Sequence, residues 1–116
     1  MNDKDNIRIL HIKDALNFIQ QNKKESMQET LINDLILRFA LERQLEIIGE
    51  AVNFLSDELK AKYTEIDWRK ITQFRNFLAH EYFGVDYEIV WNILETKIPA
   101  LQLTIDKIID DYNIKS

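Results

Sequence analysis

The longest apolar pattern in the chain is carried by "TLINDLILRFALERQLEIIGEAVNFLSDELKAK", residues 30–62. Its apolar residues recur every three or four positions, the spacing that places side chains on one face of an α-helix. No proline interrupts the segment. The pattern therefore predicts one helix of about eight turns from Thr30 to Lys62. The apolar stripe consists of Leu31, Leu35, Phe39, Leu45, Ile48, Val52, Leu55 and Leu59.

Further apolar residues widen the face of this predicted helix beyond the stripe. A helix of this length on a small domain has more apolar surface than one core requires, which favours self-association. The alternative is that the other helices of the same chain wrap around it. The additional apolar residues are Ile32, Ile36, Ala40, Ile47 and Ala51.

The segment before this helix predicts a shorter helix and a loop. Apolar residues at helical spacing indicate a first helix over residues 6–20, with Asp3 or Asp5 as its N-cap. The polar residues 21–28 indicate a loop, in which Ser26 has the spacing of a capping box for the next helix.

The second half of the chain predicts two or three more helices. Asp67 is placed to cap a helix over residues 68–83, and Gly84 is placed to end it. Asp86 can cap a fourth helix. Pro99 either kinks that helix or opens a further one.

The length and composition of the chain fit one small helical domain. The 116 residues include only 2 Gly and 1 Pro, which favours long helices over a sheet with many turns. We therefore expect a single all-α domain over residues 1–116, an antiparallel bundle of four to five helices that dimerises.

The cysteine content and the charge indicate where the protein is located and which partners it can bind. The chain has no cysteine and no apolar N-terminal segment, so we expect a soluble cytoplasmic protein with no membrane partner. Its formal net charge is −5, which disfavours general attraction to nucleic acid. Any RNA-binding site must then be local.

The stretch "FRNFLAHEYFG", residues 74–84, places three polar groups in an apolar run. Helical projection puts Arg75 and Tyr82 together at the edge of the core face, and directs Asn76 and His80 away from it. Spacing alone is compatible with ordinary surface residues, because edge arginines and tyrosines commonly bridge core and solvent.

This stretch resembles the signature of a known family. "RNFLAHEY" follows the pattern Arg, four residues, His, one residue, Tyr, and is similar to the motif of the HEPN superfamily, in particular its HepT-like ribonucleases. The flanking segments "LERQLEIIGEAVNFLS", "IDWRKI" and "EYFGVDYEIVW" resemble the same branch. The resemblance covers roughly residues 5–105.

The resemblance implies an activity and a mode of control. It implies a metal-independent endoribonuclease without a cofactor, the toxin of a type VII-like toxin–antitoxin system, whose dimer brings two motifs to one cleft. Arg75 and His80 would be catalytic. A minimal nucleotidyltransferase (MNT) antitoxin would transfer AMP from ATP to Tyr82 and silence the nuclease.

These roles are consistent with the chemistry of metal-free RNA cleavage. The reaction needs a base for the 2′-OH, an acid for the 5′-oxygen and a cation for the phosphorane. His80 suits either proton transfer and Arg75 suits the phosphate. His11 is interpreted as structural, so the second proton-transfer group is the His80 of a partner subunit, Tyr82, or Arg75 acting through water.

Several further polar residues are candidates for supporting roles. Asn76 lies one turn before His80 and either orients the imidazole, holds a phosphate oxygen or is merely solvated. Arg69, Lys70 and Arg43 are candidate RNA contacts, although each is also compatible with an ordinary surface charge.

The carboxylates at Glu46 and Glu50 are four residues apart, a spacing that can hold a metal. No histidine is near them on the same predicted helix, so we interpret them as surface or interface charges and predict no metal site.

Two other functions are compatible with the same motif. The first is a non-catalytic nucleotide- or phosphate-binding accessory subunit of a nucleotidyltransferase, in which Arg75 and His80 grip phosphate. The second is a structural homologue that only scaffolds a complex.

Overall fold

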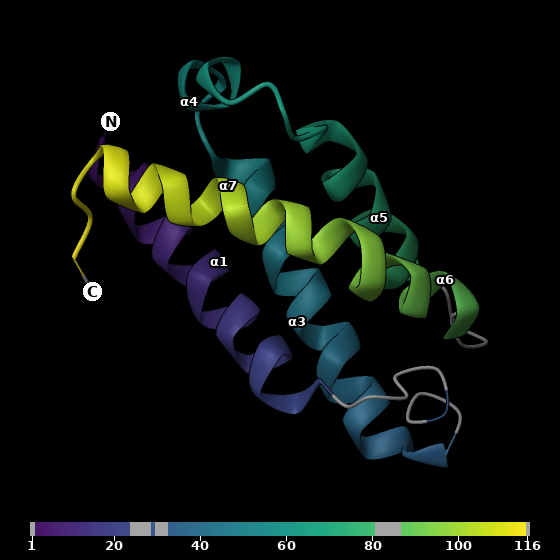
Figure 1. The fold of residues 1–116 in the computed structure, drawn as a ribbon. Coiled ribbons are helices and arrows are strands. Elements are labelled where there is room, and N and C mark those ends of the chain that lie inside the picture. The colour runs from purple at the N-terminus through teal and green to yellow at the C-terminus, as the bar shows by residue number, and fades with distance from the viewer. Residues whose placement is uncertain (1, 24–28, 30–32, 81–86, 116) are drawn as a thin grey trace.

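The computed structural model describes residues 2–23, 29, 33–80 and 87–115, except the side chains of residues 79, 80 and 87. These residues form helices and no strand, which confirms the all-α prediction (Figure 1). None of the described helices is both long and apolar enough to cross a membrane. The elements are α1 (Asp3–Asn22), α3 (Leu35–Phe54), α4 (Asp57–Lys62), α5 (Trp68–His80), α6 (Tyr87–Asn92), the π-helical η1 (Ile93–Lys97) and α7 (Ile98–Asp111).

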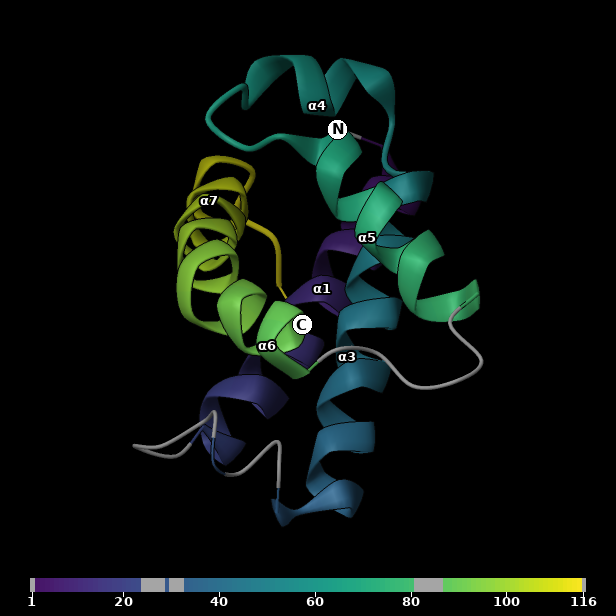
Figure 2. The ribbon, with the colours of Figure 1, turned by 90° about the vertical axis from the view of Figure 1, so that its right-hand side faces the viewer.

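Helix α3 is the element on which the others are assembled. It packs along α1 on one side and α5 on the other, while α7 packs on α1. Figure 2 shows α5 beside α3, with α7 on the other side of the molecule. Each fully buried Leu or Ile contributes about 1.5–3 kcal/mol of hydrophobic free energy. The largest fully buried side chains are Ile9, Ile12, Leu16, Ile19, Leu41, Ile48, Leu94, Leu101, Ile105 and Ile108.

The prediction of one helix over residues 30–62 was wrong at its C-terminal end. The chain leaves helical geometry at Leu55 and Ser56, and a separate α4 begins at Asp57. The Ser56 hydroxyl caps α4 by accepting a hydrogen bond from the Leu59 N–H at 3.2 Å. At the other end, Asp34 caps α3 by accepting from the Leu37 N–H at 3.0 Å, and residues 30–32 lie outside the described residues.

A buried carboxylate of α1 holds this break in place. Asp5 is only 2% exposed, and its two oxygens accept hydrogen bonds from the Ser56 N–H at 2.9 Å and the Ser56 hydroxyl at 2.6 Å. The helical periodicity continues through Ser56, but these two hydrogen bonds are available only if the chain turns there. The contact therefore replaces one long helix by α3 and α4.

The capping prediction for the first helix was also wrong. Helix α1 spans Asp3–Asn22 rather than residues 6–20, and its N-cap is Asn2, whose side chain accepts from the Asp5 N–H at 2.7 Å. The predicted loop over residues 21–28 begins two residues later than expected, because Gln21 and Asn22 are helical. Residues 24–28, with Ser26, lie outside the described residues.

The beginning of α5 follows the prediction. The Asp67 carboxylate accepts from the Lys70 N–H at 3.2 Å, which confirms Asp67 as the cap. The Trp68 indole anchors the first turn by donating to the Tyr63 carbonyl at 2.9 Å. Helix α5 is described as far as His80, and the predicted stop at Gly84 lies outside the described residues.

Tyr63 forms a hydrogen bond that connects the chain before α5 to the end of α7. It is 5% exposed, and its hydroxyl donates to the Asp111 carboxylate at 2.7 Å. Burial, followed by this hydrogen bond, raises the pKa of the Tyr63 hydroxyl, so the tyrosine stays protonated in the folded state. Hydrogen bonds of Tyr63 and Trp68 thus fix the chain at the start of α5.

The chain passes Pro99 without a break. Helix α6 continues into η1 and then α7, in which Pro99 occupies the first turn. The Ile98 N–H bonds the Ile93 carbonyl, the wider spacing of a π-helix. Pro99 therefore opens α7 after a π-helical stretch, while the predicted cap at Asp86 lies outside the described residues.

One apolar face at the start of α3 is exposed. Leu35 is 55% exposed, Ile36 84% and Phe39 60%, whereas Ala51 near the other end is buried. The alternative in which the chain's own helices cover this whole face is therefore wrong for these three residues. An apolar surface of this kind is available to a partner.

The Asp5–Ser56 contact gives a stability prediction. We expect Asp5→Ala to lower the free energy of unfolding by about 3 kcal/mol, because two hydrogen bonds to a buried carboxylate are lost. Asp3→Ala is the control: Asp3 is exposed in the same first turn, and its loss should cost about 0.5 kcal/mol. Urea unfolding of both variants measures the difference, and equal effects would contradict the proposed role of Asp5.

Candidate active site

Arg75 packs its stem directly against α3. The contact is possible because Gly49 has no side chain: a Cβ atom at residue 49 would lie 2.2 Å from the Arg75 Cβ and 2.9 Å from its Cγ. The same atom would lie 3.2 Å from the Ile71 carbonyl oxygen. Gly49 therefore allows α3 and α5 to approach at the motif arginine.

The guanidinium of Arg75 is held by the next residue. Its Nη1 donates a hydrogen bond to the Asn76 Oδ1 at 3.1 Å. Asn76 therefore orients Arg75, a role that the sequence did not suggest. The remaining N–H groups of the guanidinium can bind two oxygens of a phosphate at once.

Both residues line a cavity between α3 and α5 with a volume of about 210 Å³. A cavity of this size accommodates a phosphate or a ribose rather than a whole nucleotide. It combines a cation with neutral hydrogen-bonding groups, a carboxylate and one aromatic ring. Its lining residues are Glu50, Asn53, Phe54, Thr72, Arg75 and Asn76.

His80 and Tyr82 complete the motif along the chain. The backbone of His80 belongs to α5, one helical turn after Asn76. The His80 side chain and all of Tyr82 lie outside the described residues.

The three candidate RNA contacts do not gather around Arg75. Arg69 is exposed in the first turn of α5. Lys70 lies 4.0 Å from the Asp67 carboxylate, and Arg43 is bound to Glu46 at 3.2 Å. None of these three residues lines the cavity that Arg75 lines.

A cation from another helix lies near the cavity instead. The guanidinium carbon of Arg8 in α1 stands 4.9 Å from the centre of the Phe54 ring, which lines the cavity. No sequence pattern pointed to Arg8, because the contact joins α1 to the end of α3. Arg75 thus lines the cavity directly, and a second arginine contacts the Phe54 ring that also lines it.

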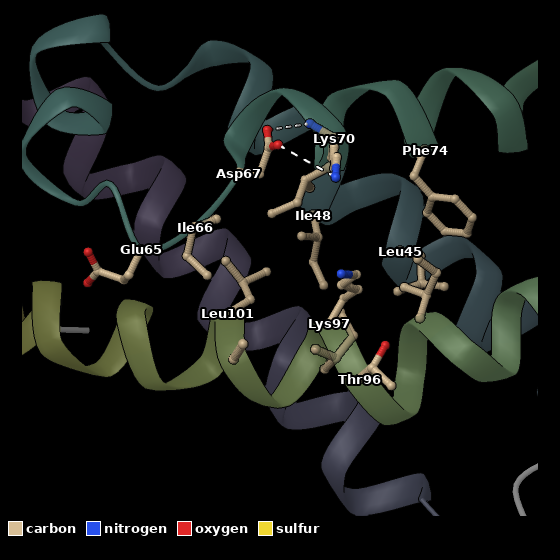
Figure 3. A pocket seen from close by; sticks show the side chains of 14 residues that line it. Leu45, Ile48, Glu65, Ile66, Asp67, Lys70, Phe74, Thr96, Lys97 and Leu101 are labelled. Carbon is tan, nitrogen blue, oxygen red and sulfur yellow. Dashed lines mark hydrogen bonds and ion pairs between the residues drawn. The ribbon is translucent and has the colours of Figure 1, made fainter.

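A larger cavity of about 350 Å³ lies on a different flank of α5, between α3 and the η1–α7 segment. Figure 3 shows apolar side chains such as Ile48 and Leu101 on its walls, with Lys70 beside Asp67 on one side and Lys97 on the other. The residues of α5 that line it are Lys70, Ile71 and Phe74, which lie with the cap residue Asp67 outside the motif. The smaller cavity is therefore the candidate active site.

The two glutamates of α3 have different surroundings. Glu46 is engaged with Arg43, whereas Glu50 faces the cavity that contains Arg75. Among the described residues, no group of three His, Asp or Glu side chains is arranged to hold a metal ion. The sequence predicted Glu50 to be a surface or interface charge rather than a site residue, although the glycine before it in the helix was a signal of close helix packing.

Comparison with known proteins assigns the family. Residues 12–108 match the model of the HepT-like family, described as "Ribonuclease HepT-like". The chain is 37% identical over 99 residues to a "Putative RNase" of Caldanaerobacter subterraneus subsp. tengcongensis, covering 85% of this chain and 88% of that protein. It is 35% identical over 97 residues to the "Probable ribonuclease HepT" of Thermococcus cleftensis, covering 84% and 88% respectively.

The chain therefore belongs to the HepT-like ribonuclease family. A third relative, a "Putative RNase" of Methanocaldococcus jannaschii, is 36% identical over 105 residues, covering 90% of this chain and 84% of that protein. No solved structure matches the chain.

The Gly49 contact gives a second stability prediction. We expect Gly49→Ala to destabilise the protein by about 1–3 kcal/mol, because the new Cβ must displace Arg75. In a helix without such a contact the same change is stabilising by about 0.5–1 kcal/mol. The control is Asn53→Ala at an exposed position of α3, expected to change stability by at most about 0.5 kcal/mol. An increase in the thermal midpoint of Gly49→Ala would contradict the close approach.

Proposed function

We propose that this protein is a metal-independent endoribonuclease, the toxin of a type VII-like toxin–antitoxin system. The observation that carries the proposal is the Arg75 guanidinium, which is held by Asn76 and lines a cavity between two helices in a HepT-like chain. Arginine binds phosphate oxygens in a fixed geometry and stays charged at any physiological pH. It suits the charge that develops on the phosphorane.

The proposed reaction is attack of a ribose 2′-oxygen on the adjacent phosphorus. The 2′-hydroxyl loses its proton to a base, the bond between phosphorus and the 5′-oxygen breaks, and the 5′-oxygen takes a proton from an acid. The products are a 2′,3′-cyclic phosphate and a 5′-hydroxyl. In this scheme Arg75 stabilises the phosphorane, Asn76 keeps Arg75 in place and His80 transfers a proton.

We further propose that the active species is a homodimer or a larger assembly. The exposed apolar residues of α3, Leu35, Ile36 and Phe39, support this, because burying them against a second copy is favourable. A dimer that covers this face would also shield the cavity from bulk water, which strengthens the electrostatic interactions of Arg75.

Control by an antitoxin completes the proposal. An MNT-type nucleotidyltransferase would attach AMP to the Tyr82 hydroxyl, with loss of pyrophosphate from ATP. The adenylyl group adds bulk and a negative charge to the motif, and it would repel the phosphate of RNA. Modification would therefore abolish substrate binding rather than unfold the protein.

Cleavage assays test the nuclease proposal. We expect induction of the wild-type protein in a bacterial host to arrest growth and fragment RNA. Purified His80→Ala should cleave RNA at least about 10²-fold more slowly, because a proton-transfer group is lost. Arg75→Ala should lose about 10²–10³-fold through loss of charge stabilisation. Cleavage by the wild type should persist in EDTA.

His11→Ala is the matched control for this test. His11 is the other histidine of the chain and is exposed on α1, so its removal should leave both cleavage and growth arrest at the wild-type level. Tight binding of nucleotides without any RNA cleavage would instead favour the accessory-subunit function.

Co-expression with an MNT antitoxin tests the control mechanism. Wild-type protein should gain the mass of one adenylyl group, which is that of AMP less one water, and lose nuclease activity, whereas Tyr82→Phe should remain unmodified and toxic. Mass spectrometry of the purified protein measures the modification. Silencing of Tyr82→Phe by the same antitoxin would show that control does not act through this tyrosine.

A further inference from the structure

Glu50 is a carboxylate of the candidate site that has no partner among the described residues. It lines the cavity with Arg75 and Asn76, and none of the hydrogen bonds or ion pairs of the described residues engages it. Glu46, one turn earlier on α3, is bound to Arg43 at 3.2 Å and does not line the cavity. The two glutamates therefore differ in their availability to a substrate.

The position of Glu50 follows from the close approach of the two helices. Gly49 lies against the stem of Arg75, so the next residue of α3 lies beside the same part of α5. Glu50 and Arg75 share the cavity without forming an ion pair, which leaves room for a substrate group between them. The carboxylate of Glu50 can accept a hydrogen bond from a ligand in this cavity, and the guanidinium of Arg75 can donate one.

We propose that Glu50 is a further catalytic residue, which accepts the proton of the ribose 2′-hydroxyl while Arg75 holds the scissile phosphate. The role rests on the nuclease function proposed above. A carboxylate repels phosphate, but it accepts a hydrogen bond from a hydroxyl group. The ribose is therefore the part of RNA that Glu50 can bind.

Glu50 supplies the second proton-transfer group that one chain otherwise lacks. The Glu50 carboxylate takes the 2′-hydroxyl proton, the 2′-oxygen bonds phosphorus, and the 5′-oxygen leaves with a proton from the protonated His80. Water then removes the proton from Glu50 and returns one to His80 before the next cycle. In this scheme one chain supplies both proton-transfer groups, so a second histidine is not needed.

The pH dependence of cleavage separates this scheme from a pair of histidines. Activity requires a deprotonated base, so it falls on the acidic side as the base becomes protonated. Glutamate side chains ordinarily titrate near 4.3 and histidines near 6.5, so a carboxylate base keeps the enzyme active at a lower pH.

The test compares Glu50→Gln with Glu46→Gln as purified full-length proteins on a short RNA oligonucleotide. We expect Glu50→Gln to lower kcat by about 10²–10⁴-fold with a small change in KM, and to lose the low-pH limb of the rate profile. Glu46→Gln should remain within about twofold of the wild type. A substrate with one 2′-deoxy residue at the cleavage site should bind equally well to wild type and Glu50→Gln, because only the ribose hydroxyl contacts Glu50.

The outcomes are distinguishable. Equal kcat and pH profiles for the two glutamine variants, with an active wild type, would overturn the role of Glu50 and leave the nuclease function intact. Failure of the wild type to cleave any RNA would overturn the nuclease function itself. Glu50→Asp, which keeps the carboxylate, should recover part of the lost kcat and thereby excludes a merely structural effect of the glutamine.

Discussion

The contact between Gly49 and Arg75 is the constraint on which the site depends. Two helices that carried side chains at this crossing would have to lie farther apart, because a Cβ at residue 49 would stand 2.2 Å from that of Arg75. A glycine inside a helix is less favourable than alanine by about 0.5–1 kcal/mol. The glycine allows the arginine stem to lie on α3, where Arg75 lines the cavity and its guanidinium bonds Asn76.

Helix α3 therefore has two functional sides: some residues pack in the core and others lie on the surface. Its buried side packs on α1 and α5, and its exposed side carries Glu50 between apolar residues such as Phe39 and Phe54. Apolar surface on both sides of a polar cavity is suited to closure by another chain, since burial of the rim excludes water from the charged centre. Assembly and catalysis would then be properties of one surface.

Two errors of the sequence prediction both involve Asp5. The apolar stripe of residues 30–62 continues in phase through Ser56, so periodicity alone could not reveal the break that Asp5 imposes from 51 residues away in the sequence. Likewise Asp5 looked like a helix cap but is a buried acceptor, and Asn2 caps α1 instead. At Ser56 a hydrogen bond between distant residues outweighs the local periodicity, whereas the cap at Asn2 is a local hydrogen bond from the Asp5 N–H three residues later.

The sequence by itself determined the all-α fold, most of the helix positions and the family, because apolar periodicity, caps and motif spacing are local properties of the chain. Only the tertiary structure decided which polar groups meet at Arg75. It placed Asn76 on the guanidinium and Glu50 in the same cavity, and it left Lys70 and Arg43 with other partners. Such contacts depend on the distance and rotation of α5 against α3, which are set by packing at Gly49 and cannot be read from either helix alone.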